Sequence, residues 1–101
     1  MIKKPVVYRI FDEILYQRSD IKIAELVVPE GSYLIGKPLY GAGIEAGFDL
    51  MVLGILDAKK GGKFIFHTDR VRKKINPGDT LVVIGKERNI ENFRKRMEQS
   101  K

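Results

Sequence analysis

The sequence contains no cysteine and no tryptophan, and His67 is the only histidine among its 101 residues. Without cysteine the chain cannot form disulfides or thiolate metal sites, which fits a reducing compartment. The serines and threonines occupy turn-like, strand-end or tail positions, so no nucleophile–base constellation is evident and we do not expect an enzyme. No apolar run approaches the roughly 18 residues that a membrane-spanning helix needs.

Positive charge is concentrated in the second part of the chain. Residues 1–56 contain 6 Lys or Arg and 7 Asp or Glu, whereas residues 57–101 contain 13 and 6, a net charge of +7. A basic half of this kind can face nucleic acid, an anionic ligand or acidic lipid, or form an ordinary solvated surface. The basic residues show neither the aromatic interleaving of a base-stacking surface nor a helix-turn-helix pattern, so a small nucleic-acid-binding protein is the less favoured alternative.

A helix is expected over residues 5–15, because Pro5 suits a first helical turn and the apolar residues that follow recur at helical spacing. Its apolar face is wider than one thin sheet layer would cover, which implies contact with a second copy or with another domain. After this helix the sequence predicts a strand over 21–28 that is ended by Pro29 and a short helix from Pro38 to Gly47. Strands over 48–58 and 64–67 follow, joined by a tight turn at Gly61 and Gly62. The last predicted elements are a turn over 75–79, a strand over 80–85, and a helix over 88–101 with Asn89 as its N-cap.

This order predicts an α+β domain: an N-terminal helix followed by β-α-β-β-β-α, with a mostly antiparallel sheet and helices on one face. Two glycine-rich stretches imitate nucleotide-binding motifs within it. "GSYLIGKP" at 31–38 has the glycine and lysine spacing of a phosphate-binding loop, but bulky apolar residues fill the arc and Pro38 replaces the hydroxyl residue that would hold magnesium. "GAGIEAG" at 41–47 has the wrong last spacing for a dinucleotide fingerprint. We interpret the first stretch as a structural turn and the second as a helix start.

Three stretches together resemble a known family: "AELVVPEGSYLIGKPL", "FDLMVLGILDAKKGGKFIF" and "INPGDTLVVIGKERNIENFRKRM". They are similar to the C-terminal regulatory domain of RCK (regulator of potassium conductance), or TrkA C-terminal, proteins, over about residues 24–97. The resemblance divides the chain into residues 1–22, a crossover-like helix and connector, and residues 23–101, the regulatory domain. It implies either a fragment of a longer polypeptide or a separate subunit, and both alternatives stay open.

The resemblance also implies a function. It predicts a cytoplasmic, ligand-sensing homodimer that regulates a potassium channel or cation transport system, the membrane partner lying in the same polypeptide or in another. Effectors of the family include cyclic dinucleotides and divalent cations, and gating would follow from an effector-dependent rearrangement of paired domains. The alternative is a similar effector-binding module attached to another transporter or to a transcription regulator.

The family has no invariant ligand motif to transfer, so the candidate site rests on charge and position. Lys59, Lys60, His67 and Arg70 lie around the second hairpin and are predicted to contact an anionic effector. Asp79, in "NPGD", is expected to cap its own turn by accepting hydrogen bonds from nearby N–H groups.

Overall fold

The computed structural model describes residues 20–39, 42–66 and 73–100 of the chain. The helix predicted over residues 5–15 lies outside the described residues. None of the helices in the described ranges is long and apolar enough to cross a membrane.

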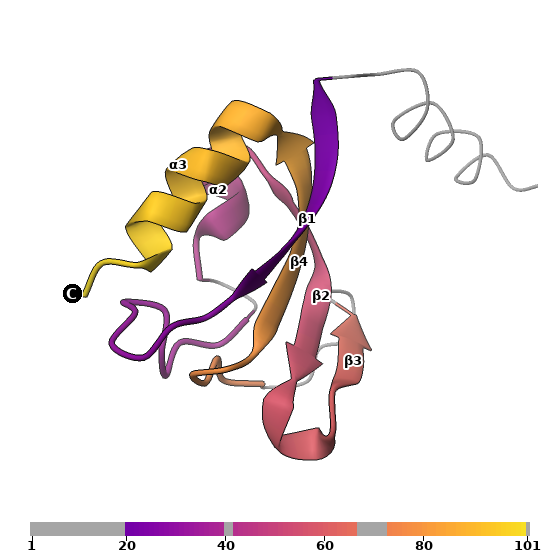
Figure 1. Cartoon of the computed structure of the whole chain (residues 1–101), viewed down its shortest axis with the longest axis vertical. Coiled ribbons are helices and arrows are strands. Elements are labelled where there is room, and N and C mark those ends of the chain that lie inside the picture. Colours follow the sequence, from indigo (N-terminus) through magenta and orange to yellow (C-terminus); the bar gives the residue numbers. More distant parts are fainter. Residues whose placement is uncertain (1–19, 40–41, 67–72, 101) are drawn as a thin grey trace, which may run out of the picture.

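The described residues form a four-stranded sheet with two α-helices (Figure 1). The strands lie in the order β1-β4-β2-β3, and each neighbouring pair is antiparallel. The elements in chain order are β1 (Ile21–Val27), α2 (Ile44–Phe48), β2 (Met51–Asp57), the 3-10 turn η1 (Ala58–Lys60), β3 (Lys63–Phe66), β4 (Thr80–Lys86) and α3 (Glu87–Met97). The predicted β-α-β-β-β-α order and its antiparallel sheet are therefore confirmed.

Both helices lie on the same side of the sheet (Figure 1). Helix α3 contacts β4, β1 and α2, and its buried residues are Ile90, Phe93 and Met97. Their spacing of three and four residues is that of a single helix face, as the sequence predicted. The Phe93 ring lies 5.1 Å from the ring of Phe48, which closes the core between the two helices.

Both bounds predicted for the short helix are wrong. Pro38 does not begin a helix: it forms an isolated antiparallel bridge with Lys74. Helix α2 starts only at Ile44, and Gly47 lies inside it rather than ending it. The chain before α2 is held extended by backbone hydrogen bonds to the distant segment 73–75, and this long-range pairing overrides the local preference of proline for a helix start.

The predicted N-cap of the last helix is also wrong. Helix α3 begins at Glu87, directly after β4, with Lys86 as the N-cap residue and no capping side chain. Because β4 pairs with β1 as far as Lys86, the chain passes from strand to helix without a connector. Asn89 is therefore already helical, and its side-chain amide donates a long 3.5 Å bond to the carbonyl of Asp49 instead.

The stretch that imitates a phosphate-binding loop is a packed structural turn, as interpreted from the sequence. Leu34 is fully buried in the core, and Gly36 turns the chain with a φ of 85°. The N–H groups of Ile35, Gly36 and Lys37 all donate to backbone carbonyls within the protein. N–H groups that are satisfied in this way cannot encircle a phosphate.

This turn is fastened to the end of α3 through Tyr33. The Tyr33 ring has the guanidinium of Arg96 3.9 Å from its centroid and the ammonium of Lys37 4.8 Å away. Its N–H donates to the carbonyl of Gln99 at 3.1 Å. Burial raises the pKa of the Tyr33 hydroxyl, although the charge of Arg96 acts in the opposite direction.

Gly54 is the glycine on which the sheet depends most directly. It lies in β2 at an irregularity in the pairing with β4 and faces Phe66 of β3. A Cβ atom at this position would overlap the Ile65 carbonyl oxygen and lie 2.6 Å from Cζ of Phe64. Neither the strand backbone nor a packed ring can move aside easily.

We expect Gly54→Ala to lower the free energy of unfolding by about 1–3 kcal/mol, the usual cost of overpacking. Gly47→Ala is the matched control, because its Cβ would meet nothing within 4 Å. In a helix that substitution should be neutral or stabilising by up to about 1 kcal/mol. Urea denaturation of both variants measures the difference, and equal stabilities would contradict the steric argument.

Candidate functional site

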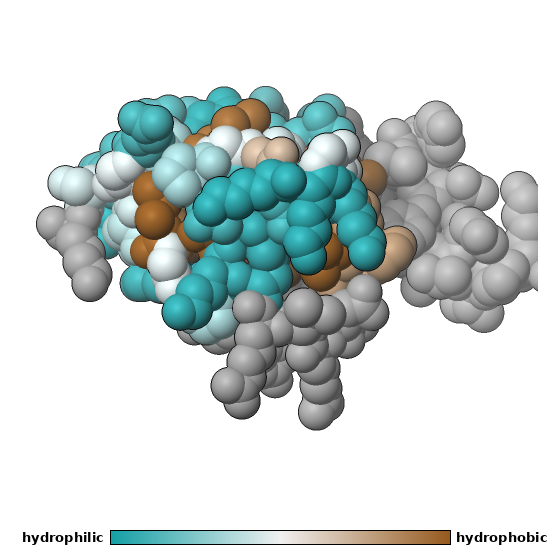
Figure 2. Space-filling model, turned by 90° about the horizontal axis from the view of Figure 1, so that it is seen from below, coloured by the Kyte–Doolittle hydropathy of each residue, from teal (hydrophilic) through white to brown (hydrophobic). Residues whose placement is uncertain are grey.

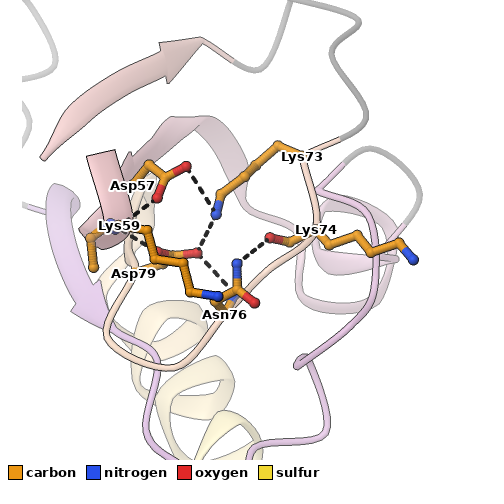
Figure 3. Close-up of polar contacts among 7 residues, drawn as sticks. Asp57, Lys59, Lys73, Lys74, Asn76 and Asp79 are labelled. Atoms are coloured by element: carbon orange, nitrogen blue, oxygen red, sulfur yellow. Dashed lines mark hydrogen bonds and ion pairs between the residues drawn. The ribbon is translucent and has the colours of Figure 1, made fainter. Parts of the chain in front are cut away.

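A buried ionic cluster lies where the β2–β3 hairpin meets the segment before β4 (Figure 3). The Lys73 ammonium is 2.8 Å from Oδ2 of Asp79 and 3.3 Å from Oδ2 of Asp57. The side chains of Lys73, Asp79 and Asp57 are 7%, 0% and 5% exposed. We call Lys73, Asp57 and Asp79 the Lys73 cluster. Charges this deeply buried persist only when each is paired and hydrogen-bonded, and here each one is.

The two carboxylates of the cluster also hold the backbone of the hairpin turn. Oδ1 of Asp57 accepts the N–H of Lys59, and Oδ1 of Asp79 accepts the N–H of Ala58, both at 2.9 Å. These are two of the N–H groups that the start of the 3-10 turn η1 leaves without a partner inside the turn. Oδ2 of Asp79 additionally accepts the N–H of Asn76 at 2.9 Å, so the predicted capping role of Asp79 is confirmed.

The protonation state of Asp57 follows from these contacts. Desolvation by burial raises the pKa of its carboxyl, but the hydrogen bonds from Lys73 and the Lys59 N–H and the nearby lysine charges outweigh this effect. The net result is a pKa below the ordinary value for aspartate. Asp57 is therefore ionised at neutral pH and balances Lys73 as a full charge.

Most of this cluster was not predicted from the sequence. Asp79 was expected to act within its own turn only, whereas it also binds Lys73 and the hairpin. Lys73 belongs to the run "RVRKK", in which nothing in the sequence distinguishes this buried lysine from the exposed Lys74. Asp57 is the last residue of the apolar strand β2, and a carboxylate at such a strand end was the signal that could have indicated a buried partner.

Two of the four predicted effector residues lie on the hairpin turn. Lys59 and Lys60 belong to η1 and are exposed, and Lys63 begins β3 nearby. In the described part of the chain no carboxylate forms an ion pair with any of these three lysines. His67 and Arg70 lie outside the described residues, so the predicted grouping of all four stays a prediction.

Figure 2 views the molecule from the hairpin end, which is the lower end in Figure 1. Hydrophilic residues cover the middle of this view. Within the described ranges, no group of three or more histidine and carboxylate side chains could hold a metal ion. The exposed Lys59, Lys60 and Lys63 place positive charge on the hairpin.

The sheet face that points away from the helices also carries apolar residues, like the face that the helices cover. Direct pairing places Ile23, Ile84 and Met51 side by side across β1, β4 and β2. Strand alternation and cross-strand pairing assign further apolar residues to this face, which also carries the polar residues Glu25 and Thr80. We call its apolar residues the open face: Ile23, Val27, Met51, Leu56, Phe64, Phe66, Val82 and Ile84.

Several side chains of the open face are strongly exposed. The exposed fractions of Val27, Phe66 and Met51 are 59%, 58% and 56%. Phe66 packs edge-on against Phe64 with ring centroids 4.7 Å apart, which makes an aromatic corner at the β3 edge. Both helices in the described ranges pack on the opposite face, together with the main core. Ile84 is buried at 6% exposure, but a group of exposed apolar side chains of this kind is typical of an interaction site.

A family model, the TrkA-C domain, matches residues 23–98. The chain belongs to the TrkA-C domain family. This match confirms the resemblance noted in the sequence, and because TrkA-C domains are regulatory rather than catalytic, it also confirms that the chain is not an enzyme.

Solved structures share the fold at low sequence identity. The RCK_C domain dimer of S. agalactiae BusR in complex with c-di-AMP superposes with a TM-score of 0.62 at 21% identity, covering 74% of this chain and 93% of that chain. The RCK C domain of the potassium transport protein KtrA, also in complex with c-di-AMP, gives a TM-score of 0.64 at 21% identity, covering 89% and 92%. BusR in complex with its busAB-promoter DNA gives 0.63 at 19% identity, covering 91% of this chain and 46% of that chain. No curated protein matches the chain by sequence.

The lowered pKa of Asp57 predicts how stability depends on pH. In the unfolded chain the pKa of an aspartate is about 3.9, which is above the pKa of Asp57 in the folded protein. The contribution of the ionised Asp57 to folding is therefore complete above that pH and is lost as pH falls through the lower folded pKa. We expect the free energy of unfolding to decrease below about pH 4 more steeply for the wild type than for Asp57→Asn. Denaturant unfolding at several pH values tests this, and parallel curves for the two proteins would refute it.

Proposed function

We propose that this chain is the cytoplasmic effector-sensing part of a regulatory homodimer for a potassium channel or cation transport system. Membership of the TrkA-C family and the fold shared with KtrA support this assignment. We retain the predicted division, with residues 1–22 as the connector to a partner and residues 23–101 as the sensing domain. The open face is the observation that carries the proposal.

A second copy of this chain is the occupant that best fits the open face. Burial of apolar surface contributes about 25 cal/mol per Å², so leaving large side chains such as Phe66 and Met51 in water is unfavourable. A sheet face can pair with its own copy across a two-fold axis, since each residue then meets its counterpart or a symmetric neighbour. The similar BusR domain is itself a dimer, which supports the same arrangement here.

The effector that we propose is a cyclic dinucleotide. Its two phosphates are anionic, and Lys59, Lys60, His67 and Arg70 would supply the positive charge to bind them. Both the BusR and the KtrA domains were solved with c-di-AMP, which supports this ligand class. A divalent cation, the other effector class expected from the resemblance, has no ligand cluster among residues 20–39, 42–66 and 73–100.

Regulation by such a module needs no chemical step. If the dimer has two pairing arrangements, an effector that binds one more tightly shifts the population toward it by its difference in affinity. The connector would pass this rearrangement to the transport protein.

A second candidate is the sensing module of a transcription regulator. The observation that favours it is the similarity to BusR in complex with promoter DNA, in which this chain spans 46% of the BusR chain. Isolating the full polypeptide from its source and testing whether it contains or binds a membrane transporter or instead binds promoter DNA would separate the two candidates. In both cases the domain itself would sense an effector as a dimer.

We expect Phe66→Glu to convert a dimer into a monomer, because it places a charge in the proposed apolar interface. The matched control is Lys95→Glu, which introduces the same side chain on the exposed side of α3. Light scattering should give the mass of two chains for the wild type and for Lys95→Glu, and one chain for Phe66→Glu. A wild-type protein that stays monomeric at high concentration would refute the proposed dimer.

We expect c-di-AMP to bind the wild-type protein with measurable heat and to raise its melting temperature. Replacing both Lys59 and Lys60 by alanine should weaken binding about tenfold, because two charge-assisted contacts are lost. Lys95→Ala is the control for the loss of a distant positive charge. Calorimetric titration that detects no binding by the wild type would overturn the proposed effector class, and equal affinities of the variants would overturn the proposed residues.

A further inference from the structure

The hairpin turn that carries Lys59 and Lys60 has little packing of its own. Every residue of η1 is exposed, and none of them contributes to the core. Its backbone is fixed instead by the Asp57 and Asp79 carboxylates, which accept the N–H groups of Lys59 and Ala58. Those carboxylates are in turn held together by one cation, the Lys73 ammonium.

We propose that Lys73, Asp57 and Asp79 are positioning residues for anion binding, which fix the hairpin turn so that Lys59 and Lys60 face the effector together. This inference rests on the proposed function, because it assumes that these lysines bind the anion. It assigns a role in anion binding to three residues that do not contact the ligand and that lie in two separate segments of the sequence.

The charge balance of the cluster explains why Lys73 is the critical member. Two buried carboxylates with one ammonium between them are stabilised, whereas the same two carboxylates without it repel each other in a poorly solvated site. The hairpin would then relax until Asp57 and Asp79 reach water, and their bonds to the turn would be lost. Figure 3 shows both dashed contacts converging on the Lys73 nitrogen.

A fixed turn increases affinity by lowering the entropy that binding must remove. Long lysine side chains on a mobile turn lose backbone as well as rotamer freedom when they bind an anion, whereas a fixed turn leaves only the rotamers to be ordered. The positioning role therefore predicts weaker binding without any change in the number of ionic contacts. Loss of a contacting lysine, by contrast, reduces the dependence of binding on salt concentration.

The experiment compares Lys73→Met with Lys74→Met. Methionine retains much of the apolar stem of lysine and removes the charge, and Lys74 is an exposed neighbour whose backbone carbonyl, not its ammonium, is the atom in contact with Asn76. Binding of c-di-AMP is measured by calorimetry at several salt concentrations, and amide hydrogen exchange is followed at Ala58 and Lys59. We expect Lys73→Met to bind about tenfold more weakly with an unchanged salt dependence, and to exchange these two amides faster. Lys74→Met should keep the wild-type affinity and exchange.

A double-mutant cycle separates positioning from a general loss of stability. In a background in which Lys59 and Lys60 are both alanine, Lys73→Met should have almost no further effect on affinity, because no lysine is left to position. The same loss in both backgrounds would overturn the inference. If Lys73→Met does not fold, Asp57→Ala tests the same point, since it removes the bond to the Lys59 N–H and keeps the Lys73–Asp79 pair.

The outcomes also distinguish this inference from the proposed function. A wild-type protein that does not bind c-di-AMP overturns both. A wild-type protein that binds, together with a Lys73→Met variant that binds equally well, overturns only the positioning role and leaves the proposed function intact.

Discussion

The ion pairs of Lys73 with Asp57 and Asp79 connect the parts of this domain that the sheet alone does not hold. Asp57 ends β2, Asp79 precedes β4, and Lys73 belongs to the segment that pairs with residues 37–39. One ammonium therefore joins the hairpin, the turn before β4 and the extended chain before α2. Since the partners are buried, removing Lys73 leaves two carboxylates without a cation in a site that water reaches poorly. Removing either aspartate instead deletes a hydrogen bond to the hairpin turn, so the contacts depend on one another.

Both faces of the sheet carry apolar residues. Helices α2 and α3 complete the core on one side with Leu81 and Val83, both fully buried. On the other side the sheet exposes Met51 of β2 and Phe66 of β3. A domain of about 100 residues has a thin core, so an additional partner on the open face would add stability as well as regulation.

Local patterns in the sequence predicted the strands, the Gly61–Gly62 turn and the buried face of α3, because alternation, positive-φ glycines and helical spacing are local properties. The wrong starting points of the two helices arise from pairing between distant segments. Pro38 is held by Lys74, and Asn89 became helical because β4 continues to Lys86. The candidate site could be predicted only in part: exposed lysines at a turn follow from local pattern, whereas the burial of Lys73 depends on two aspartates remote from it in the chain. A contact between residues so far apart in the chain produces no periodic sequence pattern from which it could be predicted.

The cluster also changes how the charge of this half of the chain should be interpreted. Residues 57–101 carry a net charge of +7, but two aspartates and one lysine of this segment neutralise one another in the interior, with one negative charge in excess. The other ionisable residues of the segment therefore carry a net charge of +8. Both interior carboxylates form ion pairs with Lys73 and accept backbone N–H groups, and in the described part of the chain neither forms an ion pair with a lysine of the hairpin. The same two aspartates thus hold the backbone of the turn and leave its lysine side chains exposed, as the proposed anion-binding role would require.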